Sequence, residues 1–325
     1  MKEGTHHDTT GLERILTLEL ARVTEAAAIA AYDQVGRGDE RAADQAAVDA
    51  MRTALNLCNF EGTVVIGEGE RDDAPMLFIG EKVGTGKGPK VDIALDPLEG
   101  TTLTAKAMAN ALAVVAIAEG GSLLHAPDTY MDKIAIGGGY ADGIVDLDAD
   151  PRDNIKALAK AKGVPTREIT ACILDRPRHS ELIAKVREAG AAVQLISDGD
   201  IAGVIHTSDP DTGIDIYIGS GGAPEGVLAA AALRCVGGQI QGRLIFRTEN
   251  ERHRAARIGI KNLNKKYHTH ELASGDVMFA ATGVTNGSML EGIHKVGDFL
   301  TSHTIVMRSK TGTVRWIKAR HVIKH

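Results

Sequence analysis

The feature that most constrains the fold is a regular alternation of helical and strand-like segments between residues 151 and 236. Apolar residues recur at helical spacing in some segments and form short continuous runs in the others. The predicted helices span 152–162, 179–189, 199–206 and 224–236, and the predicted strands span 168–174, 191–197 and 213–218. This alternation is typical of βαβ units, so it predicts an α/β fold with a largely parallel sheet.

Residues 12–150 follow a less regular pattern. Helical spacing predicts an amphipathic helix over 12–34 and an Ala-rich helix that begins at Asp39 or Asp44 and runs to about Asn59. Further strands are predicted at 62–67, 76–84, 90–95, 111–118, 129–137 and 143–147, and a hairpin turn at 310–313. The change of pattern predicts a boundary near residue 150, with a disordered lead over 1–11, an α+β subdomain over 12–150 and an α/β subdomain over 151–325.

Composition narrows the class of protein. Hydrophobic residues make up 43% of the chain and aromatic residues only 3%, which predicts an aliphatic core. The formal charge of −6 argues against a nucleic-acid binder. The lack of a signal peptide or a long apolar run predicts a cytoplasmic protein that binds no membrane. Cys58, Cys172 and Cys235 form no CxxC pair, so we expect buried core residues instead of a zinc site or disulfides.

Acidic residues gather where predicted strands end. The motif Asp-Pro-Leu-Glu-Gly-Thr at 96–101 follows a hydrophobic strand. Its Asp96 and Glu99 could bridge hard cations such as Mg²⁺ or Mn²⁺, and Thr101 could hold a water molecule. Glu68 is the first acid after another strand, in a loop whose like charges repel unless a cation compensates them. The alternatives are a polar turn in which Asp96 caps the next helix, and a solvated acidic loop.

Two more acids stand at predicted helix starts. Asp44 is expected to cap its helix unless other acids converge on it. Segment 218–226 predicts a strand, a glycine-rich turn and a helix, where the N–H groups of Gly221 and Gly222 could bind an anion. Glu225 would carry a carboxylate to the same place. A nucleotide-binding turn is the alternative, although the segment has neither a GxGxxG nor a Walker A sequence.

Basic residues follow the strand predicted at 168–174. Arg176 and Arg178 straddle Pro177, an arrangement that suits phosphate recognition, with ordinary surface arginines as the alternative. In segment 196–201, acids again follow a strand and could accept hydrogen bonds from sugar hydroxyls. Taken together, such loops predict an active site at the carboxyl edges of sheets.

These motifs resemble those of a known family. The 96–101 motif resembles the metal-binding signature of the inositol monophosphatase and fructose bisphosphatase superfamily. From about residue 12 to its C-terminus the chain is more specifically similar to class II (GlpX-type) fructose-1,6-bisphosphatases. Further motifs that carry this likeness are Gly-Arg-Gly-Asp at 36–39, Val-Ile-Gly-Glu-Gly-Glu at 65–70, Gly-Glu-Lys-Val-Gly-Thr-Gly at 80–86 and Gly-Gly-Ala-Pro-Glu-Gly at 221–226. The resemblance implies a layered α/β/α/β/α sandwich with a metal-binding and a substrate subdomain and the site between them.

The resemblance also assigns roles residue by residue. It implies metal ligands at Asp44, Glu68, Asp96, Glu99 and Glu225, and catalytic roles for Thr101, Asp44 and Glu68. It implies substrate contacts at Glu99, Gly100, Thr101, Tyr130, Arg176, Pro177, Arg178, Asp198, Gly199, Asp200 and Gly222. Two positions depart from the family pattern, because Arg176 and Glu40 stand where relatives often have lysine.

The implied activity is that of a phosphoric monoester hydrolase, which uses Mg²⁺ or Mn²⁺ to remove the 1-phosphate of fructose-1,6-bisphosphate. Such an enzyme belongs to gluconeogenesis or to Calvin-cycle and pentose phosphate metabolism, and some relatives also hydrolyse sedoheptulose-1,7-bisphosphate. We expect a homo-oligomer, either a dimer or a tetramer. The molecule that it binds is expected to be a small sugar bisphosphate. Two alternatives stay open: a phosphatase of the same superfamily acting on inositol monophosphate or a nucleotide bisphosphate, and a non-catalytic phosphosugar sensor.

Overall fold

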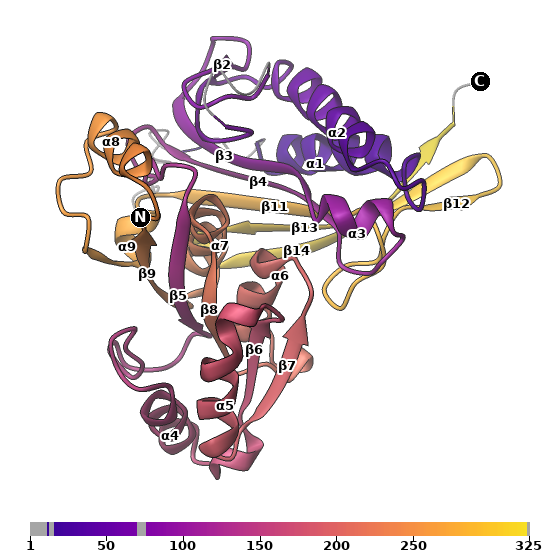
Figure 1. The fold of residues 1–325 in the computed structure, drawn as a ribbon. Coiled ribbons are helices and arrows are strands. Elements are labelled where there is room, and N and C mark those ends of the chain that lie inside the picture. Colours follow the sequence, from indigo (N-terminus) through magenta and orange to yellow (C-terminus); the bar gives the residue numbers. More distant parts are fainter. Residues whose placement is uncertain (1–11, 13–15, 70–75, 324–325) are drawn as a thin grey trace, which may run out of the picture.

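The structure, a computed structural model, describes residues 12, 16–69 and 76–323. The predicted lead over 1–11 and part of the acidic loop after Glu68 lie outside the described residues. Two sheets and the helices that cover them make up the described fold (Figure 1).

The first sheet has eight strands within the described residues, in the order β12-β13-β11-β4-β3-β1-β2, with β14 paired to β13. Its strands are β1 (Glu61–Ile66), β2 (Lys82–Val83), β3 (Lys90–Glu99), β4 (Leu112–Glu119), β11 (Val277–Gly283), β12 (His294–Val296), β13 (Phe299–Arg308) and β14 (Thr313–Val322). Its β1 and β3 run parallel, and its other pairs are antiparallel. The predicted 310–313 turn is confirmed, since it joins β13 to β14.

The second sheet has the described order β10-β9-β5-β8-β6-β7. Its strands are β5 (Tyr130–Ile136), β6 (Thr170–Leu174), β7 (Ala192–Ile196), β8 (Ile216–Gly222), β9 (Gln239–Ile245) and β10 (Lys266–His268). Only the β6–β7 and β6–β8 pairs are parallel. The prediction of a largely parallel sheet is therefore wrong, because β5 and β9 enter this sheet from outside the alternating segment and pair antiparallel.

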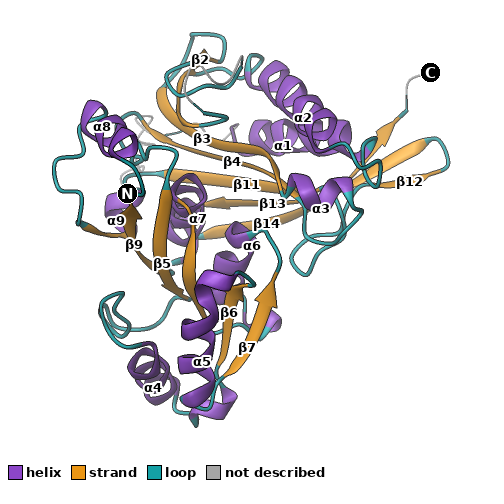
Figure 2. Ribbon diagram, viewed as in Figure 1, coloured by secondary structure: helices purple, strands orange, loops and turns teal. Residues whose placement is uncertain are grey.

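The helices form layers around these sheets. They are α1 (Leu16–Tyr32), α2 (Glu40–Leu55), α3 (Thr101–Ala105), α4 (Pro151–Lys162), α5 (Ser180–Glu188), α6 (Asp200–Ile205), α7 (Ala223–Val236), α8 (Glu249–Arg257) and α9 (Thr269–Leu272), with short 3-10 turns at 166–168, 177–179, 206–208, 210–212 and 309–311. Helices α1 and α2 cover one face of the first sheet, α7 lies between the sheets, and α4 and α5 cover the far face of the second (Figures 1 and 2). This order of layers confirms the predicted α/β/α/β/α sandwich.

Strand β4 shows why the sequence gives continuous apolar runs. Its Val114 and Ala116 face the core around α7, whereas Val115 and Ile117 face the core under α1 and α2. A strand covered on both faces has no polar side, so alternation disappears from its sequence. Helix α7 is apolar nearly all round for the same reason, because it packs against both sheets.

Two predicted strands are corrected. Of 76–84 only Lys82–Val83 forms a strand, because Gly80 and Gly84 adopt positive φ angles of 96° and 95° and turn the chain. Segment 143–147 forms no strand among the described residues. The Asp146 and Leu147 N–H groups instead bond side chains, Asn154 Oδ1 at 2.8 Å and Gln241 Oε1 at 2.9 Å.

The sheets draw strands from both sides of residue 150. Strand β5 precedes that position and joins the second sheet, and β11 to β14 follow it and join the first. The two-subdomain division stays a prediction. Within the described residues, every helix is too short or too polar to cross a bilayer.

Candidate active site

Helix α2 presents Asp44 to the site. Asp39 is the N-cap of this helix, and its side chain accepts the Ala42 N–H at 2.9 Å. Asp44 therefore lies in the second turn and is not the cap that its sequence position first suggested. Its carboxylate lines a cavity that other strand-end acids share.

Strands β1 and β3 present Glu68 and Asp96. The two strands run parallel, so their carboxyl ends meet at the same edge of the sheet. Strand β3 does not end at Asp96, because a bulge lets it continue to Glu99. Asp96 Oδ1 accepts the Leu98 N–H at 3.1 Å inside this bulge, while Gly100, at φ 88°, caps α3. The alternative in which Asp96 caps the next helix is thereby excluded.

The start of α7 presents Glu225 from the opposite side. Gly222 is the N-cap and Glu225 lies in the first turn, as predicted. The Glu225 carboxylate folds back over Gly222 so closely that a Cβ at Gly222 would lie 1.8 Å from Glu225 Oε2. A larger residue at 222 would therefore displace the Glu225 carboxylate, although the φ angle of Gly222, −65°, is open to any residue.

One cavity of about 320 Å³ gathers most of the predicted site. The predicted residues that line it are Asp44, Glu68, Asp96, Glu99, Gly100, Thr101, Asp198 and Glu225. Those placed elsewhere in the described residues are Tyr130, Arg176, Pro177, Arg178, Gly199, Asp200 and Gly222. All five predicted metal ligands thus share one cavity, although they come from positions up to 181 residues apart (225 minus 44).

Burial and mutual repulsion raise the pKa of the acids on the sheet side. Burial, followed by repulsion from Asp96 and Asp44, raises the pKa of Glu68 to about 8. Burial raises the pKa of Asp96 to about 6, although its hydrogen bond with the Glu99 carboxyl lowers it. The pKa of Glu99 rises well above its ordinary value, first through burial and then through the charge of Asp96.

The acid on α7 behaves in the same way. Burial raises the pKa of Glu225 to about 7, and the charge of Asp200 adds to the rise. With pKa values of about 8 and about 7, Glu68 and Glu225 hold protons near neutral pH, which a divalent cation could replace.

The donor set fits a divalent cation. Within the described residues, Glu225 Oε2 is fully buried yet has no hydrogen-bond partner, which is costly unless another group satisfies it. The cavity offers carboxylate oxygens, the ligands that Mg²⁺ and Mn²⁺ prefer. As they are placed across the described residues, however, no three His, Cys, Asp or Glu side chains lie close enough together to hold a metal ion, so the acids would have to move toward a bound cation.

Basic side chains lie beside this acidic cavity. Arg176 pairs with the cavity acid Asp198 at 3.8 Å, and its Nη1 donates to the Ser197 carbonyl at 2.5 Å. The Tyr130 ring contacts two guanidinium groups, with the Arg178 and Arg247 Cζ atoms 5.1 Å and 3.6 Å from the ring centroid. Neighbouring guanidiniums of this kind suit an anion such as a phosphate group.

Sequence reasoning missed three residues of this region. Asp128 lines the cavity, Arg247 stacks on Tyr130, and Lys133 forms a buried ion pair with the predicted contact Asp200. Lys133 did leave a signal, because a lysine inside the apolar run at 130–136 is unusual for a buried strand. No sequence pattern pointed to Arg247 or Asp128.

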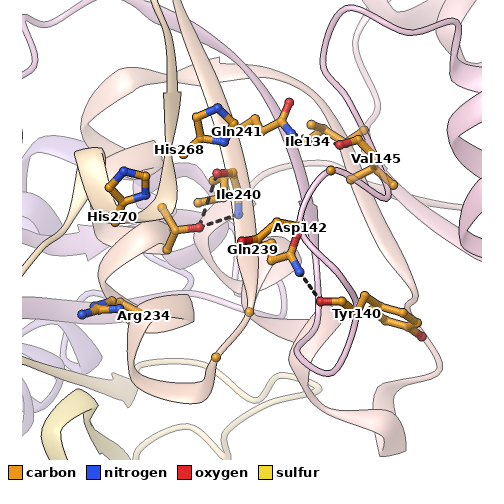
Figure 3. Close-up of a pocket in the computed structure, with 14 residues that line it drawn as sticks. Ile134, Tyr140, Asp142, Val145, Arg234, Gln239, Ile240, Gln241, His268 and His270 are labelled. Atoms are coloured by element: carbon orange, nitrogen blue, oxygen red, sulfur yellow. Dashed lines mark hydrogen bonds between the residues drawn. The ribbon is translucent and has the colours of Figure 1, made fainter. Parts of the chain in front are cut away.

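A second pocket, of about 560 Å³, lies at the other end of β5 and α7 (Figure 3). Gln239 Nε2 and Gln241 Nε2 on its wall donate to the carbonyls of Tyr140 and Val145, at 2.8 Å and 2.9 Å. It shares no lining residue with the acidic cavity in the described part of the chain, so it is separate from the candidate active site.

Comparison with known proteins identifies the family. The family model described as "Bacterial fructose-1,6-bisphosphatase, glpX-encoded" matches residues 14–321. The Escherichia coli (strain K12) protein named fructose-1,6-bisphosphatase 1 class 2 is 47% identical over 327 residues, which cover 96% of each chain. The Shigella flexneri protein named fructose-1,6-bisphosphatase class 2 has the same identity and coverage. The chain therefore belongs to the family of glpX-encoded bacterial fructose-1,6-bisphosphatases.

Proposed function

We propose that this protein hydrolyses the 1-phosphate of fructose-1,6-bisphosphate, releasing fructose-6-phosphate and phosphate, with Mg²⁺ or Mn²⁺ as cofactor. The observation that carries the proposal is the single cavity lined by Asp44, Glu68, Asp96, Glu99 and Glu225, beside a basic cluster. The family to which the chain belongs supports the substrate. Sedoheptulose-1,7-bisphosphate, with nearly the same phosphorylated end, is the second substrate that we propose.

The five acids would hold the divalent cations. When bound, these cations neutralise phosphate charge and lower the pKa of the attacking water. Phosphoryl transfer needs positioning and charge compensation more than a covalent intermediate. The site accordingly needs no Ser–His–Asp arrangement, and Cys58, Cys172 and Cys235 are buried and free.

The residues of the chain would orient water and take up its proton. Thr101 begins α3 at the cavity wall, where its hydroxyl would orient the water for in-line attack on phosphorus. The Asp44 or Glu68 carboxylate would accept the proton of the water as the new phosphorus–oxygen bond forms. As the bond between phosphorus and the C1 oxygen breaks, this proton would pass to the C1 oxygen, which leaves as the hydroxyl group of fructose-6-phosphate. Residues Asp198 and Gly199 would contact the sugar hydroxyls.

The basic cluster would bind the second phosphate. Arg178 and Arg247 present guanidiniums at the Tyr130 ring, and Arg176 adds a third positive charge next to the cavity acid Asp198. An arginine at 176 can still bind phosphate where relatives often have lysine.

The test is phosphate release from fructose-1,6-bisphosphate and sedoheptulose-1,7-bisphosphate, each with Mg²⁺, with Mn²⁺ and with a chelator. Inositol monophosphate and fructose-6-phosphate serve as monophosphate controls. We expect metal-dependent release from a bisphosphate and little from a monophosphate. Release from inositol monophosphate alone would assign the chain another substrate, and tight binding of fructose-1,6-bisphosphate without release would indicate a sensor.

A matched pair of helix variants sharpens this test. Asp44→Asn removes a cavity carboxylate, whereas Asp49→Asn changes an exposed carboxylate of the same helix. We expect Asp44→Asn to lose activity and Asp49→Asn to keep it.

We further propose that the protein forms a homo-oligomer, a dimer or a tetramer, which light scattering would test. The cytoplasmic location stays a prediction.

A further inference from the structure

Lys133, in the middle of β5, is a buried charge outside the cavity. Its side chain is only 1% exposed, and its Nζ lies 2.5 Å from Asp200 Oδ2 and 2.9 Å from the carbonyl oxygen of Gly222. Asp200 also accepts the Tyr217 hydroxyl at 3.3 Å. Lysine is almost never fully buried unless it is paired, so this position needs an explanation.

Gly221 on β8 makes room for this ion pair. A Cβ at Gly221 would lie 2.0 Å from Asp200 Oδ2 and 3.1 Å from Lys133 Nζ. The glycines directly opposite Lys133, Gly219 on β8 and Gly242 on β9, instead face His179 and Met131. Because Gly221 leaves space for it, the ion pair is built into the fold and is not a chance surface contact.

The ion pair joins the starts of two helices at the cavity. Asp200 is the first residue of α6 and follows the cavity acid Asp198. Gly222 is the N-cap of α7, which carries Glu225. One ammonium group therefore ties both helix starts to β5.

The α6 start is tied to the metal side as well. The Ile201 N–H donates to Glu99 Oε1 at 3.4 Å, so a shift of α6 would also change the position of Glu99, another cavity acid. Neither Lys133 nor Asp200 is among the described residues that line the cavity. Any effect of Lys133 on the position of the cavity acids must therefore pass through the residues that it holds, whereas its charge also acts on Glu225 through space.

We propose that Lys133 is a positioning residue of the active site, which fixes the first turns of α6 and α7 through Asp200 and the Gly222 carbonyl. In this way it keeps Asp198 and Glu225 facing one cavity. The proposal rests on the proposed function only for what the cavity does, since the clamp itself is a property of the metal-free protein.

Whether loss of the Lys133 ammonium weakens or strengthens cation binding distinguishes a positioning role from a purely electrostatic one. Removing a positive charge beside an acidic cavity would, by Coulomb attraction alone, strengthen the binding of a cation. Releasing the two helix starts would weaken it, because partners that orient metal ligands typically contribute 10- to 100-fold in affinity.

Two variants test the proposal. Lys133→Met removes the ammonium while keeping a long unbranched side chain, but it leaves Asp200 buried and unpaired. The double variant Lys133→Met with Asp200→Asn removes both charges, so the net charge is unchanged and no carboxylate is left unpaired. If the single variant does not fold, the double variant alone tests whether Lys133 is a positioning residue.

Lys162→Met is the matched control, because Lys162 pairs with Asp215 away from the cavity. Mn²⁺ affinity is measured by calorimetry on metal-free protein, and amide hydrogen exchange is followed in α6 and in the first turns of α7. We expect the Lys133 variants to bind Mn²⁺ about 10- to 100-fold more weakly and to exchange faster in both helix starts. The control should match the wild type in both measurements.

A folded double variant with wild-type or tighter Mn²⁺ binding, or with unchanged exchange in both helix starts, would overturn the proposal. Activity is measured in parallel with fructose-1,6-bisphosphate, where we expect a fall in kcat. If the wild type binds Mn²⁺ but releases no phosphate, the proposed function fails. The affinity and exchange measurements would still decide the role of Lys133.

Discussion

Gly222→Ala should disable the site while leaving the fold intact. The φ and ψ angles of Gly222 are −65° and 145°, which alanine adopts without strain. The added Cβ would, however, lie 1.8 Å from Glu225 Oε2 and 2.5 Å from its Cδ. Non-bonded heavy atoms prefer separations of about 3.5 Å, so the carboxylate oxygen must move by roughly 1.7 Å.

A shift of that size is large on the scale of catalysis. A misplacement of about 1 Å can lower the rate about 100-fold, and we expect kcat/KM of Gly222→Ala to fall at least that far. Replacing glycine by alanine at an N-cap should lower the free energy of unfolding by about 1 kcal/mol or less. The activity loss should therefore far exceed the loss of stability.

The assay compares phosphate release and thermal unfolding for Gly222→Ala and Gly120→Ala. Gly120 is the matched control, because a Cβ there would meet its nearest neighbour at an ordinary 3.6 Å. The reasoning is refuted if Gly222→Ala keeps near-normal kcat/KM and Mn²⁺ affinity. Loss of activity together with unfolding would show instead that the close approach is structural.

Three further predictions concern the cavity and the arginines beside it. Asp96→Asn should abolish turnover with little change in far-ultraviolet circular dichroism, and near-normal phosphate release would remove Asp96 from the site. Because burial raises the pKa of Glu68 to about 8, the folded metal-free protein keeps a proton that the unfolded chain loses above about pH 4.5. Stability should thus fall as pH rises from about 4.5 to about 8, and saturating Mn²⁺ should reduce that fall; a flat profile in chelator would contradict the assignment. Arg247→Ala should raise KM for fructose-1,6-bisphosphate about tenfold without changing Mn²⁺ affinity. The control Arg252→Ala, on exposed α8, should leave KM unchanged. Equal KM values for the two variants would exclude Arg247 from the phosphate site.

Sequence patterns predicted the site best where local rules suffice. Asp96 stands in the bulge near the end of β3 and Glu225 in the first turn of α7, places that neighbouring residues mark in the sequence, and both line the cavity. The role of Asp44 was harder to predict, because the choice between a helix cap and a metal ligand depends on which residue begins the helix. Asp39 takes the cap, which leaves Asp44 for the cavity.

The parts that sequence could not supply depend on contacts between distant segments. Lys133 meets Asp200 only because β5 and α6 are neighbours, and Arg247 meets Tyr130 only because β5 pairs with β9. The misplaced strand at 143–147 failed for a related reason. A distant glutamine, Gln241, takes the Leu147 N–H and so removes it from any ladder.

The position of β11 in the first sheet has a consequence for how the chain is made. This strand lies between β4 and β13, and α1 packs against both β11 and β13. The Thr282 hydroxyl donates to Thr24 Oγ1 at 2.7 Å, across 258 residues of sequence. Helix α1 therefore leaves the ribosome well before the two strands that it packs against. Contacts of such long range slow folding, so the nascent chain must keep the apolar face of α1 from aggregating until β11 and β13 have been made.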